Sequence, residues 1–130
     1  VLNRQNGNPL HKLSALMTRE NLVSMQNEVE NTYIKDSVVK YIVDLITATR
    51  NNEDILRGAS PRATLAVTAM AKAVAQLRGR DYVLPSDVRE VFIWTIAHRL
   101  ILSPKAEGQG KTAEQILIEI ISQVSAPRIR

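Results

Sequence analysis

The sequence predicts an all-α protein, a small bundle of about five helices. Apolar residues recur at three- and four-residue spacing in five segments, and residues that favour helix starts and ends stand at the boundaries of these segments. With 130 residues, of which 45% are apolar, the chain can bury one hydrophobic core but is too short for two ordinary domains. We therefore expect a single helical domain.

The first two predicted helices cover about residues 19–29 and 36–50. Thr18 is suited to cap the first helix, because its hydroxyl can accept a hydrogen bond from a first-turn backbone N–H group. The second helix has a wide apolar face, made by Val38, Val39, Ile42, Leu45 and Ile46. Each helix is therefore expected to pack through one side.

The third predicted helix, about residues 61–78, is expected to form the centre of the fold. Ser60 is a good N-cap residue, Pro61 suits the first helical position, and Gly79 suits the end of the helix. Polar residues recur every four positions, at Thr64, Thr68, Lys72 and Gln76, and most of the others are apolar. We expect that polar stripe to face water and the many alanines to allow close helix packing.

The last two predicted helices begin at about Pro85 and after Thr112. The fourth continues to about residue 97 and has an inner face made by Val88, Val91, Phe92 and Ile96. Thr112 and Gln115 have the spacing of a capping box at the start of the fifth, which continues to about residue 124. Residues 103–111 contain one proline and two glycines, which predicts a mobile loop between these two helices.

The composition excludes several classes of function. Cysteine is absent and there are only two histidines, so we expect no metal site. No apolar run is long enough to span a membrane, and we expect a cytoplasmic protein. The net charge of +4 is mild and the arginines are scattered, which predicts no specific nucleic-acid partner.

Arg62 is the most informative single residue, because it lies in the first turn of the third predicted helix. The backbone N–H groups there carry the positive end of the helix dipole, so a cation costs about 0.3–1 kcal/mol unless an anion is bound. With a phosphate present, the amides and the guanidinium would bind it together. The alternative is that Arg62 bends into solvent or pairs with Glu53 or Asp54.

Two other patterns give different hypotheses. Residues 108–112 (Gly-Gln-Gly-Lys-Thr) resemble the end of a P-loop, but Lys105 stands where that motif requires glycine and too few residues follow for the rest of the fold. Residues 78–88 are similar to the loop and helix at the end of a histone fold, which gives a DNA-binding helical module as the alternative function. Neither histidine stands beside an obvious serine nucleophile, and no pair of carboxylates lies in an apolar context that would split their pKa values, so an independent enzyme is not expected.

Three motifs occur in order along the chain: residues 58–63 (Gly-Ala-Ser-Pro-Arg-Ala), residues 77–88 and residues 98–104 (His-Arg-Leu-Ile-Leu-Ser-Pro). Together they closely resemble the C-terminal lid domain of MoxR-family AAA+ ATPases, over about residues 9–127. Three positions depart from the family pattern. Lys35 replaces a serine or threonine cap, Leu84 replaces a threonine, and residues 91–95 are more aromatic.

The resemblance implies a site and a domain organisation. Arg62 matches the sensor-2 arginine, which contacts the γ-phosphate of ATP, and Ser60 and Pro61 would lie near the nucleotide. Residues 1–17 are then a linker from a preceding nucleotide-binding domain, residues 18–127 the lid, and residues 128–130 a tail. Because the chain begins at Val1 in a linker-like segment, we expect it to be part of a longer protein.

The resemblance also implies the cofactors and partners of that longer protein. ATP and Mg would be bound mainly by the nucleotide-binding domain, so this fragment alone is expected neither to hold nucleotide tightly nor to hydrolyse it. Family members form hexamers and work with von Willebrand factor A domain proteins in chaperone-like remodelling or metal-cofactor insertion. The lid would transmit the nucleotide state to that work.

Overall fold

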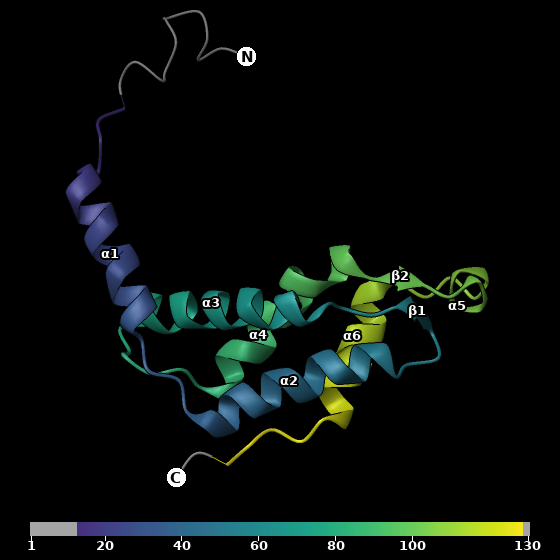
Figure 1. Ribbon diagram of the computed structural model, residues 1–130. Helices are drawn as coiled ribbons and strands as arrows, with labels where there is room; N and C mark the ends of the chain where they lie inside the picture. The colour runs from purple at the N-terminus through teal and green to yellow at the C-terminus, as the bar shows by residue number, and fades with distance from the viewer. Residues whose placement is uncertain (1–12, 129–130) are drawn as a thin grey trace, which may run out of the picture.

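The computed structural model describes residues 13–128, and these confirm the all-α fold class. Helices α1 and α2 are followed by a short strand, and a second strand separates α4 from α5 (Figure 1). A single 3₁₀ turn, η3, continues from α4. The elements in chain order are α1 (Arg19–Asn31), α2 (Asp36–Arg50), β1 (Ile55–Arg57), α3 (Pro61–Leu77), α4 (Pro85–Ile96), η3 (Ala97–Arg99), β2 (Ile101–Leu102), α5 (Pro104–Gly108) and α6 (Ala113–Gln123).

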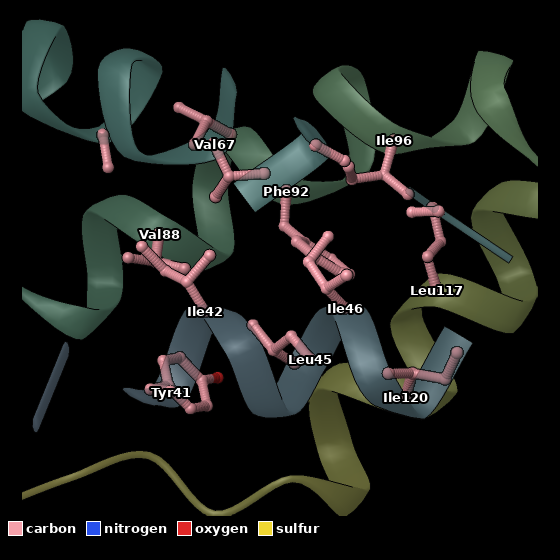
Figure 2. Packing of buried hydrophobic residues seen from close by; sticks show 14 of the residues in the cluster. Tyr41, Ile42, Leu45, Ile46, Val67, Val88, Phe92, Ile96, Leu117 and Ile120 are labelled. Atoms are coloured by element: carbon pink, nitrogen blue, oxygen red, sulfur yellow. The ribbon is translucent and has the colours of Figure 1, made fainter. Parts of the chain in front are cut away.

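The core lies between α2 on one side and α3 and α4 on the other. Figure 2 shows α2 side chains pointing toward α4 and α3, with α6 closing one end of the cluster. The fully buried residues of this core include Ile42 and Leu45 from α2, Val67 from α3, Val88, Phe92 and Ile96 from α4, and Leu117 and Ile120 from α6. The predicted inner face of the fourth helical segment is therefore confirmed, and so is that of the second except for Val39, which is only half-buried.

Alanines allow α3 to pack closely on its neighbours. Ala63, Ala71 and Ala75 are completely buried, and α3 makes its most extensive contacts with α4. Gly79 follows the C-cap of α3 with a φ of 68°, the left-handed conformation that favours glycine. The start of α3 lies at the end of the bundle where β1 and β2 pair, and its last turns lie beside α1 (Figure 1).

The predicted loop at residues 103–111 is wrong for its central part, which forms α5. Ser103 Oγ accepts a hydrogen bond from the backbone N–H of Ala106 at 3.2 Å, and Pro104 occupies the first helical position. Ala106 is completely buried, so this short helix is fixed by a cap and by one core contact. The glycines and the proline obscured it because both residue types are also typical of loops.

The polar stripe of α3 does not face open water as expected. Thr64, Thr68, Lys72 and Gln76 are each half-buried. Lys72 Nζ donates to the carbonyl oxygen of Glu30 at 2.8 Å, and Gln76 Nε2 donates to Thr32 Oγ1 at 3.0 Å. The C-terminal end of α1 therefore packs against part of this stripe.

Candidate functional site

The N-terminus of α3 has an uncapped first turn. Ser60 occupies the N-cap position, with φ −75° and ψ 160°, and Pro61 follows as the first helical residue. The Ser60 hydroxyl makes no capping hydrogen bond, which corrects the expectation that its side chain caps this helix. The Ala63 N–H group bonds only to the Ser60 carbonyl oxygen, at 2.8 Å. Because the Ser60 hydroxyl does not bind the backbone N–H groups of the first turn, these groups are suited to bind an anion.

Arg62 is exposed at this helix start and has no acidic partner among residues 13–128. The pairing with Asp54 that the sequence left open is not made, because the Asp54 carboxylate binds Lys111 Nζ instead. Glu53 makes no ion pair with Arg62 either. The guanidinium is therefore available to a ligand that approaches from outside the domain.

The segment before α3 is held against the end of α2. The Ala59 N–H group donates to Thr49 Oγ1 at 3.0 Å, and Arg50 Nε donates to the Ala59 carbonyl oxygen at 2.8 Å. Gly58 lies so close to α2 that a Cβ atom there would stand 2.6 Å from the Thr49 carbonyl oxygen. Sequence reasoning identified the motif at residues 58–63 but missed Thr49 and Arg50, which lie ten and nine residues before Ala59 and contact it.

This end of the bundle carries several arginines. Arg57 of β1 pairs in register with Ile101 of β2, and Arg99 lies two residues before Ile101. Both side chains are exposed, and neither makes an ion pair within the described part of the chain. With Arg62 they contribute three exposed cations to the elements at this end of the bundle, and such cations favour an anionic ligand.

A second charged cluster has a structural role. Asp87 is completely buried in the first turn of α4, where its carboxylate accepts from Arg80 at 2.7 and 2.9 Å and from Arg78 at 3.0 Å. It also accepts from the Leu84 N–H group at 2.8 Å. Burial raises the pKa of Asp87, but the Arg80 hydrogen bonds, the Leu84 amide and the charges of both arginines outweigh it and hold that pKa below its usual value.

This cluster weakens the histone-like alternative. Arg78 and Arg80 were the basic residues of the loop that would meet DNA phosphate. Both are occupied by Asp87, and Arg78 also pairs with Glu90. Arg80 is moreover only 19% exposed and lies over the Tyr82 ring at 5.8 Å from its centre.

Other features of the described residues are separate from the α3 N-terminus. One surface hollow is a groove between α1 and the last turns of α3, lined in part by Leu22, Met25, Ala73 and Leu77. Leu77 is fifteen residues from Arg62, roughly 22 Å along the helix. Within residues 13–128 no helix is long and apolar enough to cross a membrane, and no three potential metal ligands gather.

Comparison with known proteins gives the family. Residues 47–120 match the family model described as "AAA lid domain". The chain is 36% identical over 124 residues to Bacillus subtilis (strain 168) YeaC, described as uncharacterised, with 95% of this chain and 39% of that protein covered. It is 32% identical over 123 residues to "Chaperone MoxR1" of Mycobacterium tuberculosis, covering 88% of this chain and 33% of that protein.

A solved structure agrees with this assignment. The fold superposes with a TM-score of 0.88 and 32% identity on a Cytophaga hutchinsonii protein provisionally described as an ATPase, covering 98% of this chain and 41% of that one. The chain thus spans about a third to two fifths of the length of these relatives. It belongs to the AAA lid domain family and is the lid domain of a MoxR-family AAA+ ATPase.

Proposed function

We propose that Arg62 is a sensor-2 arginine that supplies positive charge to the γ-phosphate of ATP in the longer protein to which this lid belongs. The observation that carries the proposal is the Arg62 guanidinium, which has no acidic partner among residues 13–128, beside a helix N-terminus without a side-chain cap. Backbone N–H groups, helix dipole and guanidinium all favour a polyphosphate at this point. Ser60 and Pro61 then lie next to the nucleotide.

The rest of the proposal concerns the longer protein. Residues 1–17 link the lid, residues 18–127, to a preceding nucleotide-binding domain that holds most of the ATP and the Mg, and residues 128–130 form a tail. The protein assembles as a cytoplasmic hexamer, so that the lid contacts the nucleotide-binding domain of its own or a neighbouring subunit. With a von Willebrand factor A domain protein it performs chaperone-like remodelling or cofactor insertion, driven by ATP hydrolysis.

Within that reaction, Arg62 binds and orients the terminal phosphate. An arginine that faces the transferred phosphoryl group stabilises charge that develops during hydrolysis, and it need not change the binding of the rest of the nucleotide. Its planar fork also fixes the orientation of two phosphate oxygens, which an ammonium cannot do. The lid thereby senses whether a terminal phosphate is present.

Substitution of Arg62 tests this function. In the full-length protein, Arg62→Ala is expected to lower ATP turnover by about 10²–10⁴-fold with the fold intact, and Arg62→Lys to restore it only partly. Steady-state phosphate release and circular dichroism are the measurements. Arg89→Ala, which removes an exposed arginine of α4, is the matched control and should leave turnover unchanged. Wild-type turnover in Arg62→Ala would remove Arg62 from the mechanism.

A further inference from the structure

We propose that Thr49 and Arg50, the last two residues of α2, are positioning residues that hold Arg62 in its working place. This inference rests on the proposed function of Arg62. This role does not require either residue to contact the nucleotide. They act on Ala59, three residues before Arg62, and so on the point at which α3 begins.

The Thr49 hydroxyl makes two hydrogen bonds in different directions. It donates to the Ile46 carbonyl oxygen within α2 at 2.7 Å and accepts from the Ala59 N–H group at 3.0 Å. A hydroxyl has one donor and two acceptor lone pairs, so it can make both bonds at once. Thr49 is completely buried and Ala59 is 1% exposed. If the Thr49 hydroxyl were removed, water could not readily take its place as the partner of the Ala59 N–H group.

Arg50 holds the other polar group of the same residue. Its Nε atom donates to the Ala59 carbonyl oxygen at 2.8 Å. Two consecutive residues of α2 therefore bind both backbone polar groups of Ala59. Because these two groups belong to the peptide units before and after Ala59, both units have little freedom to rotate, which fixes the direction in which the chain leaves toward α3.

Gly58 and Pro61 make this connection stiff. A side chain at Gly58 would meet the Thr49 carbonyl oxygen at 2.6 Å and the Arg50 Cα atom at 2.8 Å, so the two backbones are in direct contact. Pro61 fixes its own φ close to the helical value. Any shift of Ala59 is therefore transmitted to Arg62, and a displacement of about 1 Å at a catalytic group can cost up to 10²-fold in rate.

A comparison with Thr95 shows that the bond from Thr49 to another segment does not follow from burial alone. It is also buried in a helix, and its hydroxyl donates to the Val91 carbonyl oxygen at 2.7 Å. Within residues 13–128, however, it accepts no hydrogen bond from another segment. Thr49 and Thr95 thus differ mainly in the bond to Ala59, which makes Thr95 a matched control.

The first experiment compares single variants in the full-length protein. Thr49→Val keeps the shape but removes the hydroxyl, and we expect it to lower kcat for ATP hydrolysis about 10-fold with KM little changed. Thr49→Ser keeps the hydroxyl and should recover most of the loss. Arg50→Met, which keeps the aliphatic stem, should also lower kcat, whereas Thr95→Val should not. Equal effects of Thr49→Val and Thr95→Val would overturn the inference.

A double-mutant cycle separates this inference from the proposed function. If Thr49 acts through Arg62, adding Thr49→Val to Arg62→Ala should change turnover less than about 2-fold. A further 10-fold loss would mean that Thr49 acts elsewhere and would overturn the positioning role. A normal rate in Thr49→Val beside a large loss in Arg62→Ala would overturn this inference alone. A normal rate in Arg62→Ala would overturn the proposed function.

Discussion

Asp87 is a buried carboxylate whose charge is balanced by two arginines that still reach solvent. Arg80 is 19% exposed and Arg78 is 46% exposed, whereas the Asp87 side chain is inaccessible. The carboxylate also accepts the Leu84 N–H bond at the start of α4. One residue therefore joins the turn after α3 to the first turn of α4. Within the described residues, its loss would leave Arg80 without an acidic partner and Arg78 with Glu90 alone.

Asp87→Asn is expected to lower the free energy of unfolding by about 2–4 kcal/mol at pH 7, because it removes the charge that both arginines face. Urea denaturation of the two proteins measures the difference. Asp81→Asn, at an exposed position in the same turn, should change the stability by less than about 0.5 kcal/mol. Similar losses in both variants would show that the buried charge is not the cause.

The same pair of variants should show a specific pH dependence. The pKa of Asp87 is lower in the folded state than its ordinary value of 3.8, so its contribution to stability is complete above that value. It is lost as the pH falls through the lowered pKa. The difference between the wild type and Asp87→Asn should therefore be constant from about pH 5 to 7 and should shrink at lower pH.

At the scale of elements, α3 depends on alanine because its neighbours approach closely. Ala71→Leu adds volume at a completely buried position, so we expect a loss of about 1–3 kcal/mol in the free energy of unfolding. Ala69→Leu, two positions earlier on the exposed side, is the control and should be nearly neutral. If both variants have the same denaturation midpoint, the α3 packing described above is wrong.

The sequence predicted the long elements well because their signals are local. Asp36–Arg50 and the Thr112–Gln115 capping box agree with the structure, and the predicted third helix ends one residue late. It could not predict the β1–β2 pair, because Ile55 and Leu102 meet only when distant segments fold together. The water-facing stripe of α3 was wrong for a similar reason, since nothing near Lys72 in the sequence indicates that Glu30 will contact it.

The candidate site was likewise predictable only where its sequence signals are local. The position of Arg62 in a helix start could be derived from Ser60 and Pro61 alone, since both favour that place. The hydrogen bonds of Thr49 and Arg50 to Ala59 could not be predicted, because a threonine and an arginine at a helix end have many ordinary uses. The buried role of Asp87 was also missed, since an aspartate in a first turn is already explained by the helix dipole.

At the scale of the whole molecule, charge and apolar surface are distributed unequally. Three exposed arginines, Arg57, Arg62 and Arg99, lie on the elements at the end where α3 begins, and the groove beside Leu22 and Met25 lies at its other end. In the function proposed above, this domain supplies an anion-binding edge and another part of the protein supplies most of the nucleotide site. That is the reason for testing turnover in the full-length protein.

Helix α1 differs from the rest of the molecule because none of its residues is buried. It contacts mainly α3, and its C-terminal end is held by hydrogen bonds from Lys72 and Gln76.

Because α1 would expose little apolar area on separating from α3, it is expected to open without unfolding the core. In hydrogen–deuterium exchange its amides should therefore exchange well before those of α2 and α4. Exchange of all three helices at one common rate would contradict this. We therefore expect a cooperative core and one separately unfolding unit at its N-terminal side, so that strain applied there is relieved locally before it reaches Arg62.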